Sequence, residues 1–276
     1  MENYSKKALF DILAITGSIV TITLAFFPST FTCLIDNYHK STIGAILTII
    51  ILTYFYITQK KCFINLKVNE TTKLNISYGN LFDKKGITII PVNDFFDTIV
   101  DDNIISKKTL HGIFINKYFK TKEDIENLAN QINRSLKQCE YIEENRKEGK
   151  GNKKRYQLGT TAIVEVNNKK FFLVAVSKFD ITTNRAMLKI SDYPLVLSKM
   201  MEFIHNYSQG YQVNIPLIGG GHLGINLTKE KLLEMIIFSI YTAEKIAILH
   251  GINIVLHDSL KNEINLNRVF YTCNKS

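Results

Sequence analysis

The chain has 276 residues, of which 46% are hydrophobic and 21% are charged, and its formal net charge is +9. With 14 Gly and 4 Pro, this composition excludes the collagen-like, intrinsically disordered and low-complexity classes. The charge is unevenly distributed: residues 1–61 hold five Lys and three acidic residues, whereas residues 62–276 hold 29 basic and 22 acidic residues. The chain therefore combines an apolar N-terminal segment with a charged remainder.

The N-terminal segment contains two long apolar stretches. Residues 12–35 are 24 residues without a formal charge, and residues 41–59 are another 19. About 20 helical residues cross a hydrocarbon core of ~30 Å. We therefore expect residues 1–61 to form a transmembrane helical hairpin with spans at about 10–35 and 41–59. Lys residues precede the first stretch and follow the second, so the positive-inside rule predicts a multi-pass protein with both termini in the cytoplasm.

Two other interpretations of this segment exist. A cleaved signal peptide would explain the first stretch, but the stretch is long, no A-x-A-like cleavage site ends it, and a second stretch follows at once. Two buried helices of a soluble protein would require every face of both helices to be covered. The hairpin is the interpretation that the sequence favours.

Residues 62–276 are predicted to form one α/β domain. Short β-rich runs predict strands at 63–68, 73–78, 86–92, 160–166, 171–176, 212–218 and 253–257. Longer runs predict helices at 123–139, 194–207 and 229–249. Asn167-Asn168 predicts a hairpin turn, and Thr228 is the expected N-cap of the last helix. Strands interspersed with helices indicate a mixed sheet flanked by helices.

Residues 145–155 (NRKEGKGNKKR) carry six basic residues and one Glu. We expect a solvated loop here; contact with anionic lipid headgroups or with a phosphorylated ligand is the alternative. The rest of the domain is almost charge-balanced and has no DNA-binding motif, so no nucleic-acid partner is expected.

Metal and nucleophilic-serine chemistry have no support in the sequence. The four Cys show no C-x-x-C spacing, and the six His show no zinc-like pairing. G-x-S-x-G, Walker A and kinase signatures are missing. We therefore expect no metal site and no cofactor.

The most informative motif is a glycine-rich loop, Gly219-Gly220-Gly221-His222-Leu223-Gly224, which follows a predicted strand and precedes a predicted helix. Glycine allows a ligand to approach the backbone closely, and inward-turned N–H groups beside a helix N-terminus bind anions. The loop lacks the G-K-[ST] of a P-loop and the acidic strand that follows a Rossmann fingerprint. It predicts a phosphate site, with a simple tight turn as the alternative.

Three other segments, in a matching order, resemble the macro domain family, whose members bind ADP-ribose at the carboxyl edge of the sheet. Gly79-Asn80-Leu81 resembles the family's G-D-[IV], and Val92-Asn93-Asp94-Phe95-Phe96 resembles its V-N-A-A-N. The end of the glycine-rich loop resembles the diphosphate loop G-[IV]-[YF]-G, and residues 106–112 (SKKTLHG) lie between. Over roughly residues 73–258, the resemblance implies ligand contacts from Asn80, Leu81, Asn93, Asp94, His111, Gly112, Gly219, Gly220, Gly221, His222, Leu223 and Gly224.

Together with the two predicted spans, the chain resembles the membrane-anchored macro-domain effectors of type II Thoeris anti-phage defence in bacteria. The resemblance implies that a TIR-domain partner enzyme makes an ADP-ribose conjugate, histidine-ADP-ribose, from NAD. The macro domain senses the conjugate, and the effector assembles into a homo-oligomer and damages the inner membrane in an abortive infection.

The sequence also departs from the family pattern. Phe96 replaces the second Asn of V-N-A-A-N, and residues 106–112 have one Gly in place of several, so a water-positioning group is missing. Asn80 replaces an Asp but can still accept a hydrogen bond from the adenine amino group, whereas Leu223 replaces an aromatic residue. These departures predict a sensor without catalytic residues. The alternative function is a membrane-tethered ADP-ribosyl hydrolase that uses Asn93 or Asp94 with a bound water. A simpler interpretation of Asn93, Asp94 and Asn80 is that they are turn residues.

Overall fold

The computed structural model describes residues 14, 17–18, 21–22, 44–46, 48–53, 61–146, 150–221, 224–244 and 246–273. The chain divides into two compact units, Met1–Lys61 and Cys62–Ser276. Among the residues so described, no helix is long and apolar enough to cross a bilayer. The predicted spans at about 10–35 and 41–59 lie largely outside the described residues. The transmembrane hairpin therefore stays a prediction.

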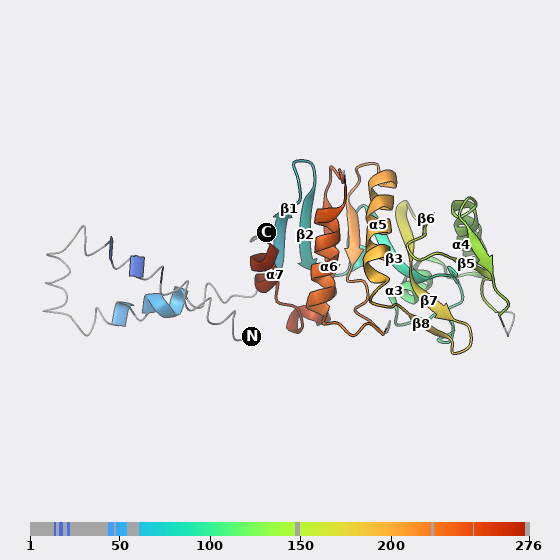
Figure 1. Cartoon of the computed structure of the whole chain (residues 1–276), viewed down its shortest axis with the longest axis horizontal. Coiled ribbons are helices and arrows are strands. Elements are labelled where there is room, and N and C mark those ends of the chain that lie inside the picture. Colours follow the sequence, from blue (N-terminus) through green and yellow to red (C-terminus); the bar gives the residue numbers. More distant parts are fainter. Residues whose placement is uncertain are drawn as a thin grey trace, which may run out of the picture. The chain divides into compact units, whose positions relative to one another are not determined.

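The second unit is built on a mixed sheet (Figure 1). Its strands within the described ranges are β1 (Phe63–Lys67), β2 (Lys73–Tyr78), β3 (Ile87–Asn93), β6 (Thr161–Val166), β7 (Lys169–Asp180), β8 (Arg185–Met187), β9 (Val213–Pro216) and β10 (Ile252–Leu256). Their order is β1-β2-β10-β9-β3-β7-β6, and β8 pairs with β7. The run from β2 to β7 is parallel, whereas β1, β6 and β8 are antiparallel to their neighbours. The carboxyl ends of the parallel strands therefore share one edge.

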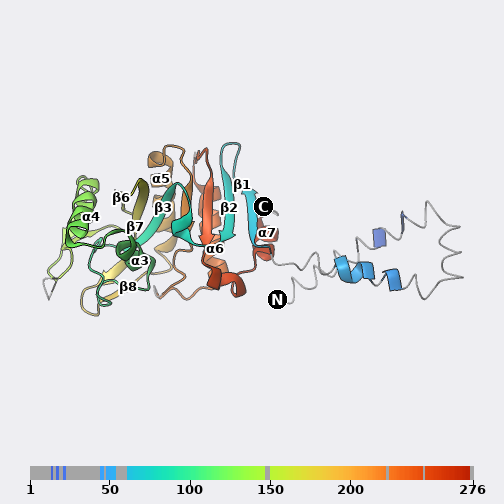
Figure 2. The same cartoon turned by 180° about the vertical axis from the view of Figure 1, so that it is seen from behind.

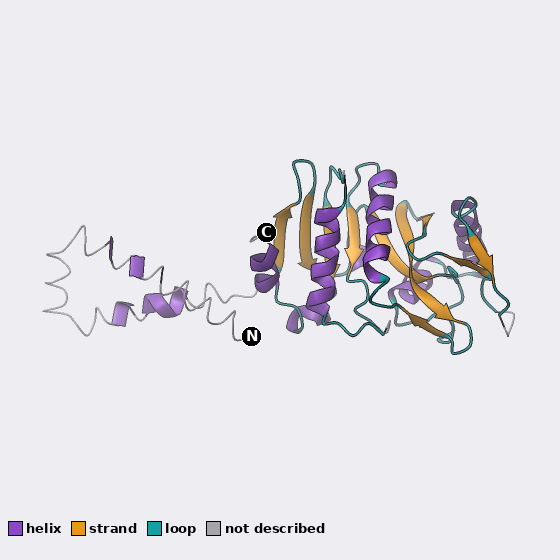
Figure 3. Cartoon of the chain, in the orientation of Figure 1, coloured by secondary structure: helices purple, strands orange, loops and turns teal. Residues whose placement is uncertain are grey.

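Helices cover both faces of this sheet, as Figures 2 and 3 show. The helices are α3 (Leu110–Tyr118), α4 (Lys122–Ser135), α5 (Tyr193–Tyr207), α6 (Lys229–Thr242) and α7 (Leu266–Cys273), with two short 3-10 turns, η1 (Leu81–Asp83) and η2 (Asp258–Asn262). One buried cluster contains side chains of α5, α6 and α7, and the other contains side chains of α3 and α4. β3 contributes Ile87 and Ile89 to the first cluster and Ile90 to the second, because successive strand residues face opposite sides.

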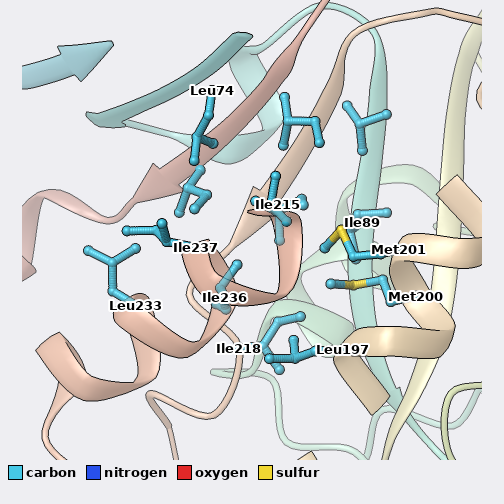
Figure 4. Close-up of a cluster of buried hydrophobic side chains, with 14 of the residues drawn as sticks. Leu74, Ile89, Leu197, Met200, Met201, Ile215, Ile218, Leu233, Ile236 and Ile237 are labelled. Carbon is cyan, nitrogen blue, oxygen red and sulfur yellow. The ribbon is translucent and has the colours of Figure 1, made fainter. Parts of the chain in front are cut away.

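The larger cluster fixes α5 and α6 against the sheet (Figure 4). Leu74, Ile89 and Ile215 from three strands meet Met200 of α5 and Ile236 of α6, and all five are fully buried. Each such side chain contributes about 1.5–3 kcal/mol on transfer from water. This burial holds α5 and α6 against one face of the sheet.

A ladder of asparagines crosses the middle of the sheet. Asn253 on β10 lies in register with Asn75 on β2 and Asn214 on β9. Its Nδ2 donates to Oδ1 of Asn214 at 2.8 Å, and its Oδ1 accepts from Nδ2 of Asn75 at 3.1 Å. Asn214 in turn donates to the carbonyl of Lys85 at 2.8 Å. A one-residue slip would break this chain of bonds, so the ladder specifies the register.

The mixed sheet flanked by helices is confirmed, and each of the seven predicted strands has a counterpart. Asn167 and Asn168 have φ values of 51° and 58°, as a tight hairpin turn requires, and the Thr228 side chain caps α6 by accepting from the Lys231 N–H. The prediction missed α3, α7 and β8, and also the small hairpin of β4 (Tyr141–Glu143) and β5 (Lys154–Tyr156).

The prediction of a helix over 229–249 is wrong at its C-terminal end, because α6 ends at Thr242. Residues after it pack against the turn between β1 and β2. The Asn69 amide donates to the Ile246 carbonyl at 2.8 Å, and the Thr72 hydroxyl accepts from the Ile248 N–H at 2.9 Å. Tertiary contacts thus override the helical periodicity of the segment.

Candidate functional site at the carboxyl edge of the sheet

Most of the predicted site residues lie where neighbouring parallel strands end. Gly79 and Asn80 follow β2, and the glycine-rich loop (residues 219–224) begins three residues after the end of β9. Asn93 is the last residue of β3. Because β2, β10, β9 and β3 are consecutive neighbours and parallel, these exits are brought to one edge. In open α/β sheets, ligands bind at this edge.

The glycine-rich loop has a firmly held start and an open end. Gly219 has φ +84°, and a Cβ there would lie 2.8 Å from Cδ1 of Ile225. At Gly221 and Gly224 a Cβ would meet nothing within 4 Å. His222 and Leu223 lie outside the described residues. The structure thus leaves the backbone at Gly221 accessible, in a loop that precedes α6 along the chain.

A buried tyrosine holds the entrance of this loop. Tyr193, the first residue of α5, donates its hydroxyl to the carbonyl of Ile218 at 2.8 Å, and both residues are fully buried. Burial raises the pKa of the Tyr193 hydroxyl far above its ordinary value, so it stays a donor. The sequence had no signal for this contact, because the two residues are 25 positions apart.

At the exit of β2, the backbone is tied to the neighbouring strand. The Gly79 N–H donates to the Leu256 carbonyl at 2.8 Å. The Asn80 side chain is exposed, and its Oδ1 accepts from the Phe82 N–H at 3.1 Å as the N-cap of η1. Leu81 is buried in the smaller core cluster. Asn80 therefore has the structural role of a turn residue, and its contact with a ligand stays a prediction.

At the exit of β3, the Asn93 side chain is bonded within the protein. Its Nδ2 donates to Asp97 at 3.0 Å, and its Oδ1 accepts from the N–H groups of Phe95 and Asp97, both at 3.2 Å. Phe96 is fully buried with φ +51°, a conformation that few non-glycine residues adopt. The chain makes a tight turn at this exit. Because the Asn93 side chain is bonded internally and Phe96 is buried, a ligand can contact only the backbone of the turn.

The Asp94 side chain is also bonded within the protein. Its Oδ1 accepts from the Phe179 N–H at 2.9 Å, and its Oδ2 lies 3.5 Å from Nε of Arg155. The side chain is 2% exposed. Burial raises the pKa of this carboxyl to about 6, because desolvation outweighs the Phe179 hydrogen bond and the Arg155 charge, which both lower it. Asp94 therefore titrates close to physiological pH.

The basic segment 145–155 is not simply a solvated loop, and that expectation is wrong for its arginines. Arg146 is 6% exposed and lies 2.6 Å from Oδ1 of Asp97, which is fully buried. Arg155 contacts Asp94 and also lies 3.3 Å from Glu144. Asp94 and Asp97, which follow β3, are buried and need cationic partners, and this segment supplies them. The two aspartates were visible in the sequence, but nothing in the sequence indicated which basic residues would pair with them.

His111 and Gly112 have structural roles in the described part of the chain. His111 is buried, and desolvation lowers its pKa to about 3, against a hydrogen bond to the backbone of Asp97 that raises it. The ring is therefore neutral at physiological pH. Gly112 lies so close to the carbonyl oxygen of Ser106 that a Cβ would collide with it. His111 thus bonds the segment to the β3 exit, and Gly112 allows the close approach of its own chain at Ser106.

The structure has two notable cavities. One of about 1010 Å³ runs between α5 and α6 and is lined by residues such as Met201, Leu227 and Phe238. The other, of about 560 Å³, is lined by Asp94, Arg155, the β4–β5 hairpin and the first turns of α5. The glycine-rich loop lines neither of these two cavities. No cluster of three or more His, Cys, Asp or Glu that could hold a metal ion occurs in the ranges that the structure describes.

Comparison with known proteins agrees with this geometry. Residues 74–257 match the family described as "Thoeris protein ThsA, Macro domain". The chain is 29% identical over 231 residues to the Thoeris protein ThsA of Bacillus amyloliquefaciens, an alignment that covers 80% of this chain and 75% of that protein.

Solved macrodomains share the fold. A macrodomain of Oceanobacillus iheyensis with ADP superposes with a TM-score of 0.54 at 10% identity and covers 78% of this chain and 98% of that one. A mutant of the same macrodomain with ADPR gives a TM-score of 0.52 at 10% identity, covering 77% and 99%. At this identity the likeness concerns the fold alone.

Proposed function

The chain belongs to the macro-domain family of the Thoeris protein ThsA, and from this membership we propose that it is a sensor of an ADP-ribose-derived signal in anti-phage defence. The ligand that we propose is a conjugate such as histidine-ADP-ribose, made from NAD by a TIR-domain partner enzyme. Binding, not turnover, is the proposed activity.

The observation that carries this proposal is the order of the strand exits along the edge. Asn80 follows β2, the glycine-rich loop follows β9, and Asn93 ends β3, and these strands lie in the order β2-β10-β9-β3. A ligand with its diphosphate on the glycine-rich loop would place adenosine toward Asn80 and the distal ribose toward Asn93. ADP-ribose has the same order of parts.

The state of the β3 exit favours a sensor over the hydrolase alternative. A hydrolase would need a side chain that is free to orient a water against the distal ribose. The Asn93 amide and the Asp94 carboxylate are both held by internal hydrogen bonds, and Phe96 is buried. The residues of this exit serve to shape a binding surface.

The output that we propose is assembly into a homo-oligomer that damages the membrane. The two apolar stretches of residues 1–61 support this proposal, since each is long enough to span a bilayer. The spans would place the protein in the bacterial inner membrane with both termini in the cytoplasm. A ligand drives such a change only by binding the assembled state more tightly, and moving a 1:99 equilibrium to 99:1 takes ~5.5 kcal/mol of difference.

The test uses the full chain in liposomes that contain a trapped dye. We expect histidine-ADP-ribose to increase the mass of the protein assembly and to release the dye from the liposomes. The ligand should be recovered unchanged. Recovery of free ADP-ribose would instead support the hydrolase. Tight binding without a change in mass or in dye release would refute the effector role.

A further inference from the structure

The segment 145–155 makes a second set of contacts that reaches the backbone of the β3 exit. Nδ2 of Asn152 lies 3.0 Å from the carbonyl oxygen of Phe95 and 2.8 Å from that of Phe96. The backbone N–H of Asn152 donates to Oδ1 of Asp97 at 2.8 Å. One residue of the segment thus bonds to three consecutive residues of the exit.

Arg146 also contacts this turn, and we call Arg146 and Asn152 together the brace. Its Nη1 lies 2.6 and 2.8 Å from the two carboxylate oxygens of Asp97. Its guanidinium also packs on the rings of Phe95 and Phe179, with Cζ 4.8 and 4.7 Å from their centres. Gly151, at φ +84°, lets the segment pass here, because a Cβ at this position would collide with Arg146 and Asp97.

The brace acts on a backbone that needs support. Phe96, at φ +51°, is in a strained conformation that persists only where its surroundings impose it. Asn152 bonds to the carbonyl of Phe96 itself and to that of the residue before it. Without this amide, the turn after β3 would lose two of the hydrogen bonds that fix its shape.

The β3 exit is next to the strand that leads into the glycine-rich loop. β3 and β9 are neighbouring parallel strands, β3 ends at Asn93, and β9 ends at Pro216, three residues before the loop. In the orientation proposed above, with the diphosphate on the loop and adenosine toward Asn80, a nucleotide diphosphate would bind without the β3 exit. Only a group attached beyond the second phosphate would then reach that exit.

We propose that Asn152 and Arg146 are positioning residues that shape the β3 exit and so let the site distinguish ADP-ribose from ADP. This inference rests on the proposed function. The brace acts through the backbone of Phe95 and Phe96 and does not itself touch the ligand. Its loss would weaken the contacts to the distal ribose and leave those to the diphosphate unchanged.

The test measures the affinity of the purified full chain for ADP-ribose and for ADP by calorimetry. Asn152→Ala removes both side-chain hydrogen bonds, and Asn152→Asp removes the donors at nearly constant shape. We expect each to bind ADP-ribose about tenfold more weakly, a difference of ~1.4 kcal/mol, with the affinity for ADP unchanged. Arg146→Lys, which keeps the charge but not the two-oxygen contact, should give a smaller loss of the same kind.

Asn133→Ala, an exposed position on α4, is the matched control and should change neither affinity. Should Asn152→Ala fail to fold, Asn152→Ser, which keeps one donor, is measured in the same way. Equal losses for ADP and ADP-ribose, or no loss for either, would overturn the inference while leaving the sensor intact. An unsubstituted chain that binds neither nucleotide would refute the proposed function instead.

Discussion

Tyr193 donates its hydroxyl to the Ile218 carbonyl at 2.8 Å and so couples the first residue of α5 to the last residue before the glycine-rich loop. Both groups are fully buried, so water cannot replace either partner. The loop therefore starts from a fixed point, whereas Gly221 and Gly224 further along it face open space. A rigid base under an accessible backbone suits a phosphate site.

Tyr193→Phe should test this anchor. The change leaves the buried Ile218 carbonyl without a donor, so we expect the free energy of unfolding to fall by about 1–3 kcal/mol and ADP-ribose binding to weaken. Urea unfolding and calorimetry on the same samples measure the two effects. Tyr207→Phe is the control, because the Tyr207 ring is 51% exposed and should tolerate the change. Equal behaviour of the two variants would contradict the anchor.

Three glycines of the loop should respond to valine in two different ways. At Gly221 a Cβ meets nothing within 4 Å, so Gly221→Val should keep the melting temperature yet abolish ADP-ribose binding by filling the path of the phosphate. Gly224→Val should also abolish binding, with some strain from its φ of +72°. Gly219→Val, by contrast, should lower stability by about 1–3 kcal/mol, because its φ is +84° and Ile225 is in contact. Unchanged binding by a folded Gly221→Val chain would place the ligand elsewhere.

The pKa of Asp94 predicts an unusual dependence of stability on pH. The carboxyl has a pKa of about 6 in the folded state and 3.8 ordinarily, so between these values the folded state binds more protons than the unfolded state. Its contribution is therefore greatest below pH 4 and is lost as the pH rises through 6, by roughly 3 kcal/mol. His111, with a pKa lowered to about 3, acts in the opposite direction as the pH falls below 6.5.

Comparison with Asp94→Asn isolates the Asp94 contribution, because His111 titrates in both proteins. We expect the stability of the unsubstituted chain, relative to the variant, to increase as the pH falls from 7 to 4 in urea titrations. A constant difference would mean that burial and the favourable contacts of Asp94 cancel, and a decrease as the pH falls would mean that these contacts, including the Arg155 charge, outweigh burial.

Asn253→Leu tests the asparagine ladder. The change leaves the Oδ1 of Asn214 and the Nδ2 of Asn75 without the partners they have in the sheet. We expect a loss of about 1–3 kcal/mol in the free energy of unfolding, measured in urea. Asn65→Leu on the edge strand β1, where the side chain is exposed, should change stability by less than about 0.5 kcal/mol. A loss of equal size at both positions would argue against the ladder.

The transmembrane hairpin predicts a topology that cysteine labelling can measure. Single cysteines placed in the 36–40 linker and at Ser276, in a background without the native cysteines, should be labelled from opposite sides of the membrane. Labelling of both positions from the same side would refute the hairpin.

The fold was largely predictable because its signals are local. Periodic apolar runs placed the strands, and Thr228 and the Asn167-Asn168 pair marked a helix start and a turn. The site was predictable only to the level of strand exits. Which side chains are free there depends on partners distant in sequence, such as Arg146 for Asp97, 49 residues away. The motif Val92-Asn93-Asp94 predicted ligand contacts; in the structure the Asn93 side chain bonds within the turn, and Asp94 accepts from Phe179 and contacts Arg155 of the basic segment.

The most direct test of the sensor is calorimetry of the purified full chain with ADP-ribose, histidine-ADP-ribose and NAD, in parallel with the Gly221→Val variant. We predict saturable binding of both ADP-ribose compounds, tighter for the conjugate, which the variant loses without a change in melting temperature. Failure of the folded, unsubstituted chain to bind any ADP-ribose compound would contradict the account.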